Sequence, residues 1–279
     1  MRKILISNNN GLTGAVFPDY GGMLAGLEFR GKKILAYDEE QMILSPLLFG
    51  GNPVLFPFPS KTKNDSYLIE GKEYHMPFHG LVVNAAFSVE ECSENSVRLS
   101  ITNSETNLKE HYPFQYRLGL KYTLLEDGVN LSATVENRSD RKLPHYFGWH
   151  FYFAASDKTK LELKIPMKRY IDYTDGQTKT NNSAQDLCVK TDYVFYDKTG
   201  AMIEMINHAD GYRAELISDE VFEVATVCTR FDGKICVEPW IGLPDSINSG
   251  KYVQWVDPGI KETYGTTIKL YDLDEGFKP

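Results

Sequence analysis

The sequence predicts an all-β fold, a sandwich or a barrel built from many short strands. Short runs rich in β-branched and aromatic residues alternate polar and apolar side chains, the period-2 pattern of a half-buried strand. No long segment carries the i, i+3, i+4 spacing of an amphipathic helix, and the strongest helical pattern is short, at residues 38–48. Many regularly spaced strands with few short helices indicate two packed sheets or one closed sheet.

The predicted strands follow one another with turn residues between them. In chain order they cover residues 96–103, 116–128, 129–139, 160–166, 201–207, 212–218, 222–229, 234–240 and 266–273. Turn residues predict hairpins at 126–128 and 136–139, and further turns at 210–211 and 232–233. No repeat of fixed period and no flexible linker divides the chain. We therefore expect residues 1–279 to form a single domain.

Charge and hydropathy exclude several classes of function. The chain has 30 lysine and arginine residues against 38 aspartate and glutamate residues, a formal charge of -8. It therefore lacks the overall basic character that a nucleic acid or an anionic membrane would require. No run approaches the roughly 20 apolar residues of a membrane span, and the N-terminus lacks the apolar stretch of a signal peptide. The expectation is a cytoplasmic protein with no nucleic-acid or membrane partner.

Cysteine and histidine spacing predicts neither a disulfide nor a metal site. Cys92, Cys188, Cys228 and Cys236 form no CxxC pair, and reduced thiols are expected in a reducing compartment. The six histidines show no HxH or HExxH pattern, so no metal ligand is assigned. GxGxxG, P-loop and GxSxG motifs are also absent from the sequence.

Residues 50–81 form the first segment that breaks the strand pattern. Its prolines cannot sit inside a central strand and predict a rigid loop, and rigid loops on β scaffolds often carry binding residues. His79, which precedes Gly80, is a candidate hydrogen-bond donor to a ligand oxygen. A surface histidine with no such role is the alternative that the residue types leave open.

The second segment, residues 143–154, sorts into two faces if it is one strand. One face would place His150 between Tyr146 and Tyr152, with Gly148 leaving space, as in a ligand-facing wall. Histidine titrates near neutral pH and can donate a proton there. A hydrogen-bonded structural histidine is the alternative. The opposite, core-facing side carries Phe147, Trp149, Phe151 and Phe153, with His145 at its start.

The third segment, residues 234–248, places Glu238 in an otherwise apolar run. Lone carboxylates are seldom buried unless they are paired or used, so Glu238 is either a general base or half of a structural salt bridge. Trp240 beside it offers a flat surface for a sugar ring. Asp192 is a weaker candidate, because acidic residues at strand ends are common.

These segments, in this order, resemble the aldose 1-epimerase (galactose mutarotase-like) family, in its bacterial, substrate-unassigned branch. The matching strings are GGNPVLFP (50–57), EGKEYHMPFHG (70–80), GWHFYF (148–153), TDYVF (191–195), and ICVEP (235–239) followed by PDSIN (244–248). Each string alone is weak, but their order and spacing extend over nearly the whole chain.

The resemblance implies a galactose mutarotase-like β-supersandwich with an open cleft and no metal or organic cofactor. It also implies an isomerase that interconverts the α and β anomers of a monosaccharide. Glu238 matches the family glutamate that takes the proton of the anomeric hydroxyl, and His150 matches the histidine that donates to the ring oxygen. His79 matches the second, substrate-binding histidine, and Asp192 matches an aspartate that holds sugar hydroxyls. With ordinary pKa values of about 4.3 and 6.5, the glutamate would be ionised and the histidine poised to donate near neutral pH.

Two positions depart from the family pattern. Lys61 stands where the family has an arginine in the first loop, and a lysine lacks the rigid guanidinium fork. Val83, in HGLVVN, stands where relatives carry a basic residue. Because a phosphate needs fixed cationic donors, the departures favour a free hexose over a hexose 6-phosphate. We assign the substrate contacts to His79, Asp192, Lys61, Trp240 and Tyr152. The protein is expected to be a monomer or a weak homodimer.

Three alternatives to a free-hexose mutarotase stay open at this point. One is a hexose-6-phosphate mutarotase, for which Lys61 and Lys63 supply cations. Another is a carbohydrate-binding or sensing protein that keeps the cleft without turnover. The third is a glycosidase or lyase, and hydrolysis would need a second carboxylate, for which Asp192 is the candidate.

Overall fold

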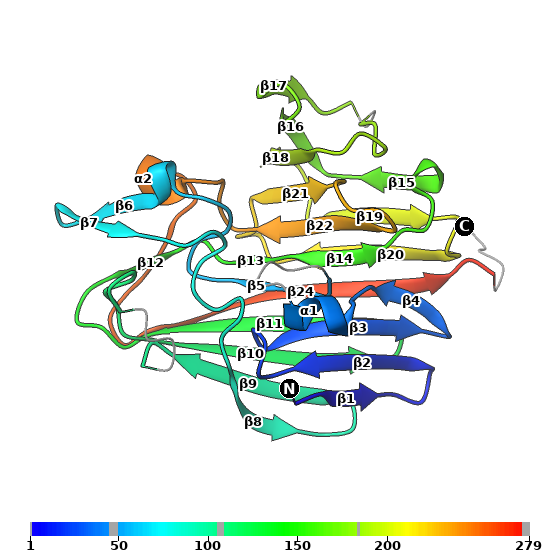
Figure 1. Ribbon diagram of the computed structural model, residues 1–279, viewed down its shortest axis with the longest axis horizontal. Helices are drawn as coiled ribbons and strands as arrows, with labels where there is room; N and C mark the ends of the chain where they lie inside the picture. Colours follow the sequence, from blue (N-terminus) through cyan, green and yellow to red (C-terminus); the bar gives the residue numbers. More distant parts are fainter. Residues whose placement is uncertain (1, 45–49, 105–108, 183–184, 275–279) are drawn as a thin grey trace.

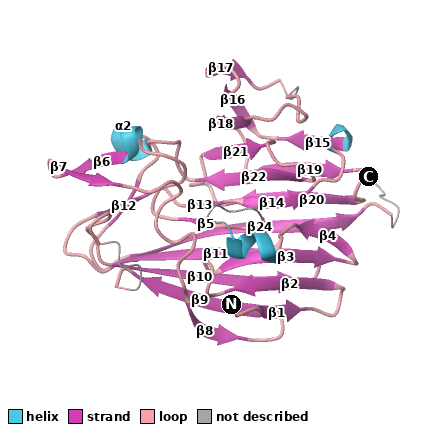
Figure 2. Cartoon of the chain, in the orientation of Figure 1, coloured by secondary structure: helices cyan, strands magenta, loops and turns pink. Residues whose placement is uncertain are grey.

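The protein is built from two large β-sheets that pack face to face, as Figures 1 and 2 show. This computed structural model describes residues 2–44, 50–104, 109–182 and 185–274. Neighbouring strands within each large sheet run antiparallel. Two α-helices of one or two turns occur within the described residues. The all-β prediction is therefore confirmed, and the sandwich is the form that it takes.

The larger sheet contains 12 strands within the described ranges and carries the site discussed below. Its order is β1-β2-β3-β4-β14-β22-β21-β18-β16-β17, with β13 paired to β22 and β5 paired to β13. The strands are β1 (Ile4–Ser7), β2 (Leu12–Phe17), β3 (Met23–Phe29), β4 (Lys32–Leu35), β5 (Val54–Leu55), β13 (Gly148–Trp149), β14 (Phe151–Ala154), β16 (Met167–Asp172), β17 (Gln177–Thr180), β18 (Asp192–Lys198), β21 (Val224–Cys228) and β22 (Lys234–Trp240).

The second sheet has eight strands in the described chain, in the order β15-β19-β20-β24-β11-β10-β9-β8. They are β8 (Ser88–Cys92), β9 (Ser96–Thr102), β10 (Tyr116–Leu125), β11 (Gly128–Asn137), β15 (Leu161–Lys164), β19 (Met202–Asn207), β20 (Tyr212–Ser218) and β24 (Lys261–Asp272). Two small sheets pair β6 (Ser66–Ile69) with β7 (Lys72–His75), and β12 (Leu143–His145) with β23 (Gln254–Val256). The helices are α1 (Glu39–Leu44), α2 (Ser246–Ser249) and the 3-10 turns η1 (Lys63–Asp65) and η2 (Lys158–Lys160).

Each run predicted as a strand overlaps one, and three of the four predicted turns join paired strands. The hairpin expected at 136–139 is wrong, because β12 pairs with β23 and not with β11. The Asn137 side chain explains this: its amide donates to the carbonyls of Arg141 and Val256, both at 2.8 Å, and holds a bend that leads out of the sheet. In the helical pattern at 38–48, α1 ends at Leu44 and the rest lies outside the described residues.

The core lies between the two large sheets. Trp149 and Phe151 of the larger sheet are fully buried there, and Tyr122 of the second sheet brings its ring centre within 6.3 Å of Trp149. Burial of each such side chain contributes about 1.5–3 kcal/mol to folding. This core cluster extends from Ile6 to Leu270. The opposite face of β14, β22, β21 and β18 packs in a smaller apolar cluster, which includes Tyr152 and Trp240. That second face therefore positions the site.

No helix in the described part of the chain has the length and apolar character needed to cross a membrane.

Candidate active site

A cleft of about 580 Å³ opens over the second face of the larger sheet. All seven residues predicted from the sequence line it: Lys61, His79, His150, Tyr152, Asp192, Glu238 and Trp240. Among them, the two histidines and the glutamate, His79, His150 and Glu238, are buried. Another hollow, of about 550 Å³, lies beside β15 and residues 185–188 and contains none of the predicted residues. The chemistry is therefore sought in the first cleft.

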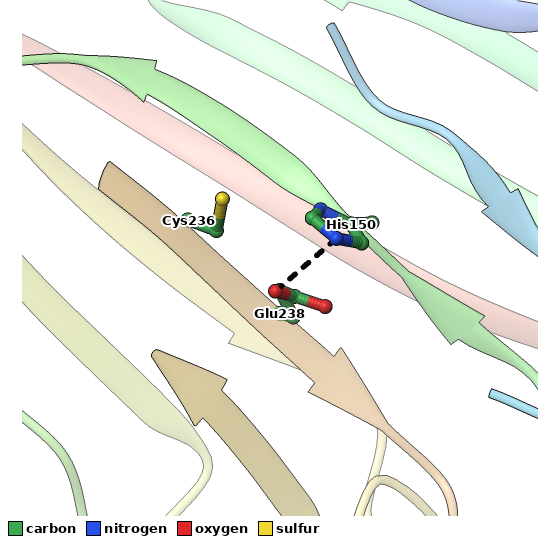
Figure 3. Close-up of side chains that lie close together, drawn as sticks. All are labelled: His150, Cys236 and Glu238. Carbon is green, nitrogen blue, oxygen red and sulfur yellow. Dashed lines mark ion pairs between the residues drawn. The ribbon is translucent and has the colours of Figure 1, made fainter. Parts of the chain in front are cut away.

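Strand register places His150 opposite Glu238 on the floor of the cleft. Tyr152 of β14 pairs with Cys236 of β22, and Gly148 of β13 pairs with Trp240 of β22. His150, midway between Gly148 and Tyr152, consequently faces Glu238, which lies midway between Cys236 and Trp240. The His150 Nε2 atom is 3.4 Å from Glu238 Oε1, and Figure 3 shows the two side chains directed at each other. Among the described residues no lysine or arginine pairs with Glu238, so the salt-bridge alternative has no such partner here.

The next two strands extend the same floor. Thr226 of β21 pairs with Glu238, and Cys228 of β21 pairs with Cys236. Asp192, at the start of β18, pairs with Cys228. Since side chains two residues apart share a face of a sheet, these positions all belong to the cleft side. Glu238 in β22, His150 in the segment beside it and Asp192 at the start of β18 therefore come to one surface.

The segment 143–154 is not one continuous strand. It breaks into β12, β13 and β14, with His150 in the gap between the last two. The His150 amide donates to Asn52 Oδ1 at 3.0 Å, so a fully buried asparagine fixes the backbone at the break. The prediction that Tyr146 shares the ligand-facing wall is wrong, because its ring is buried in the core and stacks on Phe58 at 4.8 Å. Tyr152 does share that wall, with its ring stacked on His150 at 4.6 Å.

The space expected beside Gly148 is filled by Trp240. A Cβ atom at Gly148 would lie 2.4 Å from Trp240 Cδ1 and 3.0 Å from Pro59 Cγ. The missing side chain thus lets the indole pack closely against the strand, and Trp240 is only 3% exposed at the cleft floor. Glycine at 148 is a packing requirement of the tryptophan.

Replacing Gly148 with alanine is expected to destabilise the fold by about 1–3 kcal/mol, the usual cost of overpacking. The added methyl group must displace the buried Trp240 ring, which also lines the cleft. Thermal unfolding followed by tryptophan fluorescence measures the effect. Gly233→Ala, in the β21–β22 turn where no heavy atom lies within 4 Å of the added carbon, controls for loss of a glycine, although its positive φ adds backbone strain. An unchanged melting temperature for Gly148→Ala would contradict the packing argument.

His79 is held by a reciprocal pair of hydrogen bonds with Ser60. The His79 amide donates to the Ser60 carbonyl at 2.9 Å, and the Ser60 amide donates to His79 Nδ1 at 3.0 Å. Because Nδ1 accepts, the neutral ring carries its proton on Nε2, which is left as a donor. The ring lies 5.3 Å from that of His150, and the residue is 5% exposed. His79 is therefore a preset neutral donor, and the surface-loop alternative does not hold.

Burial moves the pKa values of the facing pair away from their ordinary values. It raises the pKa of the Glu238 carboxyl well above its usual value, and Cys228 and Asp192 add to this, while the Trp240 side chain opposes it. Burial also lowers the pKa of His150 to about 3 and lowers that of His79. The ordinary values expected from the sequence are therefore wrong for both members of the pair. The physical cause is desolvation, which disfavours each charged form.

These shifts leave one transferable proton on the His150–Glu238 pair near neutral pH. Whether that proton sits on the carboxyl or on the imidazole, the pair has the same total charge and protonates or deprotonates as a unit. The pair can accept a proton at one atom while it gives one from the other. That is the requirement of an acid–base couple that acts at two oxygens of one molecule.

Asp192 forms an ion pair that the sequence did not indicate. Arg230 Nε and one of its terminal nitrogens both lie 3.0 Å from Asp192 Oδ2, and both residues line the cleft. Arg230 directly follows the predicted strand 222–229 and precedes a predicted turn, which is the only sequence signal that could have located it. Other lining residues that sequence reasoning missed are Ser60, Phe78, Tyr173, Val194, Thr226, Cys228, Phe231 and Pro244.

Lys61 and Val83, the two positions that depart from the family pattern, lie in different surroundings. Lys61 is exposed at the cleft, with its Nζ 5.9 Å from the centre of the Phe78 ring. Val83 is 8% exposed, packs in the apolar cluster under the cleft and does not line it. The valine is thus part of the packing, and Lys61 and Arg230 supply the positive charge at the described cleft wall.

The fold and the sequence were compared with known proteins. The sequence model of the aldose 1-epimerase family matches residues 2–210. The plasmid form of protein LacX from Lactococcus lactis subsp. lactis is 30% identical over 261 residues, covering 80% of this chain and 85% of that protein. Its chromosomal form is 29% identical over 260 residues, with the same coverage of both chains.

Solved structures from several organisms share the fold. The Slr1438 protein from Synechocystis sp. PCC 6803 superposes with a TM-score of 0.92 at 22% identity, over 97% of this chain and 96% of that chain. A galactose mutarotase related enzyme from Lactobacillus acidophilus superposes with a TM-score of 0.81 at 18% identity, over the full length of both chains. At these identities the likeness concerns the fold, and it confirms the galactose mutarotase-like sandwich expected from the resemblance. With the family match covering most of its length, the chain belongs to the aldose 1-epimerase family.

Proposed function

We propose that this protein is an aldose 1-epimerase that interconverts the α and β anomers of a free hexose. The observation that carries the proposal is the facing pair His150 and Glu238, 3.4 Å apart on the floor of a cleft of about 580 Å³. A volume of this order is in the range of small-molecule sites and accommodates a pyranose ring. Family membership supports the reaction class.

In the proposed reaction Glu238 takes the proton of the anomeric hydroxyl while His150 gives a proton to the ring oxygen. The bond between C1 and the ring oxygen breaks, and C1 becomes an aldehyde carbon. After rotation about the C1–C2 bond, the ring oxygen attacks the other face of C1. The proton on the ring oxygen then returns to His150, and Glu238 returns its proton to the new anomeric hydroxyl. The pair starts and ends with one proton, so no further proton donor is needed.

The remaining wall provides the sugar contacts in this proposal. His79 donates through Nε2 to a sugar oxygen, and its pairing with Ser60 orients that donor before the sugar arrives. The Asp192–Arg230 pair offers both acceptor and donor atoms to hydroxyl groups. Trp240 and Tyr152 supply apolar surface at the floor, and Lys61 lies at the exposed margin.

Polarimetry on freshly dissolved α-D-glucose and α-D-galactose tests the proposal. We expect a rate of approach to anomeric equilibrium above that of buffer for at least one sugar in a panel of free aldoses. Rates equal to buffer for every sugar, together with calorimetric binding of one of them, would instead establish a carbohydrate-binding protein. Faster turnover of hexose 6-phosphates than of free hexoses would show that Lys61 and Arg230 serve a phosphate. Release of reducing sugar from an aryl glycoside would indicate hydrolysis.

The pH profile should show no loss of activity near pH 6.5. The one-proton pair gains a second proton only near the lowered pKa of His150, about 3, and loses its proton only at the raised pKa of Glu238. We therefore expect kcat/KM, corrected for the buffer reaction, to stay level as pH rises from about 5 to 7.5. With ordinary pKa values it would fall above about 6.5, since the histidine would lose its proton. A halving of kcat/KM near that pH contradicts the desolvated pair.

Replacing Arg230 with glutamine should weaken sugar binding more than turnover. Loss of one or two hydrogen bonds to substrate or to Asp192 corresponds to a rise in KM of about three- to tenfold, with a smaller change in kcat. The matched control is Arg169→Gln, because Arg169 also pairs with an aspartate, Asp197, on the larger sheet but outside the cleft. The exposed fractions of the two pairs are similar, 50% and 31% against 52% and 29%. Equal effects of the two substitutions on KM would remove Arg230 from the substrate site.

The sequence-based expectations of a single domain, a cytoplasmic location and a monomer or weak homodimer stay predictions. The core cluster that extends from Ile6 to Leu270 supports the first of them.

A further inference from the structure

Cys236 lies beside the proposed acid–base pair and has no part in the reaction proposed above. Residues 236 and 238 are two positions apart on β22, so their side chains share the cleft face of the sheet. His150 faces them from the neighbouring segment. One ligand atom from each of His150, Cys236 and Glu238 lies within 4.8 Å of the other two, and all three residues are buried (Figure 3). Histidine nitrogen, cysteine sulfur and carboxylate oxygen are the ligand types of zinc sites.

The spacing of the pair matches that of two ligands on one metal ion. In tetrahedral zinc sites the nitrogen and oxygen ligands lie about 2.0–2.2 Å from the metal, which puts them about 3.4 Å from each other. His150 Nε2 and Glu238 Oε1 are 3.4 Å apart. Cys236 Sγ is near enough to be the third ligand with a small rotation of its side chain. Three protein ligands leave a fourth position for water.

Charge balance favours a divalent ion at this buried place. A thiolate and a carboxylate together carry two negative charges and neutralise the ion, while a neutral imidazole adds none. A neutral cluster avoids the large desolvation cost of an unpaired charge. The thiolate also selects zinc over the hard cations magnesium and calcium, which prefer oxygen ligands.

We propose that His150, Cys236 and Glu238 form a binding site for Zn²⁺, and that the bound ion inhibits the protein. The ion is coordinated by His150 Nε2 and Glu238 Oε1, the two atoms that exchange protons with the sugar in the proposed reaction. The protein with zinc bound therefore cannot catalyse mutarotation. The inhibitory half of this inference rests on the proposed function, whereas the binding half does not. No sequence motif indicates this site, because its ligands come from two separate segments.

The test uses the full chain with Cys92 and Cys188 replaced by serine, because these two exposed thiols would bind metal on their own. Calorimetric titration with Zn²⁺ should show one ion per chain, and Mg²⁺ should show none. Co²⁺, used as a spectroscopic substitute, should give a thiolate-to-metal absorption band. Adding Cys236→Ser should remove the band and weaken Zn²⁺ binding at least about 100-fold, the upper end of the loss caused by outer-shell changes.

The matched control is Cys228→Ser, since Cys228 is also buried and lies opposite Cys236 on β21. It should keep both the band and the affinity. Thermal unfolding without metal checks that each variant folds, and Glu238→Gln provides a second ligand variant, which should also bind more weakly. No binding at one ion per chain, a band that survives Cys236→Ser, or a band lost only with Cys228→Ser overturns the proposal.

Polarimetry separates the two halves of the inference. If the protein is a mutarotase, saturating Zn²⁺ should abolish its activity and a chelator should restore it, with the inhibition weakened at least about 100-fold in Cys236→Ser. Binding with undiminished mutarotation would overturn the inhibitory role. Binding to a protein that turns over no sugar would leave the metal site intact and count against the proposed function alone.

Discussion

Glu238→Gln is expected to lower kcat/KM for mutarotation by about 10²–10⁴-fold, the usual contribution of one general acid or base. Glutamine keeps the size of the side chain and can hydrogen bond to the sugar, but it cannot take up the proton of the anomeric hydroxyl. The loss should therefore appear mainly in kcat, with KM little changed. Polarimetry at several concentrations of the preferred sugar separates the two constants. A variant with wild-type kcat would rule out Glu238 as the base.

The same substitution should leave the fold as stable as before or make it more stable. The carboxyl is 2% exposed and its pKa is raised in the folded protein, so at neutral pH folding must protonate a group that is ionised in the unfolded chain. This cost grows as pH rises above about 4.5, and the gain in stability of Glu238→Gln should be larger at pH 8 than at pH 5. Glu215→Gln is the matched control, because Glu215 is buried outside the cleft and pairs with Arg213. It should lose stability and keep activity.

His150→Gln is expected to lower kcat by a similar factor, about 10²–10⁴-fold. The amide retains hydrogen-bonding capacity but cannot move a proton to the ring oxygen, and it gives up the stacking on Tyr152. Because the two residues share one proton, removing the second partner should cost little once the first is gone. The double variant Glu238→Gln/His150→Gln should therefore be about as slow as the slower single variant.

His145→Gln is the control for replacing a buried histidine in the same segment. His145 is fully buried, its pKa is also lowered to about 3, and its Nε2 lies 3.0 Å from the Tyr264 hydroxyl in the core. The substitution should lower the melting temperature and leave kcat unchanged in the folded fraction. If it lowered kcat as much as His150→Gln, the effect at 150 would reflect general damage to the fold. Multiplicative losses in the double variant would mean that His150 and Glu238 act independently.

Local sequence patterns predicted what depends on neighbours in the chain. The run 234–240, with Glu238 in otherwise apolar surroundings, predicted a strand, and β22 occupies those residues. Prolines indicated a loop at the segment that carries His79. The position of a catalytic candidate on a face follows from period 2 alone.

Properties set by distant residues could not be read in this way. The break at His150 depends on the Asn52 side chain, and the filled space at Gly148 depends on Trp240. Arg230 became a candidate only when the pairing of β18 with β21 brought it to Asp192. The pKa values of His150 and Glu238 required their burial, which no single segment reveals. The roles of Glu238 as base and His150 as acid came from the family resemblance, because alternation of side chains does not assign chemical roles.

The pairing of β14, β22 and β21 under the cleft also limits where residues can be inserted or deleted. Deleting one residue from β22 would turn Glu238 toward the inter-sheet core and put an apolar neighbour in its place, since successive strand residues point to opposite faces. The same holds for β14 and β21, whose residues meet β22 position by position. Loops such as 61–65 and 242–245 have no such alternation to preserve and border the same cleft. Insertions and deletions that change sugar preference among homologues should therefore accumulate in those loops, while the three strands keep their length.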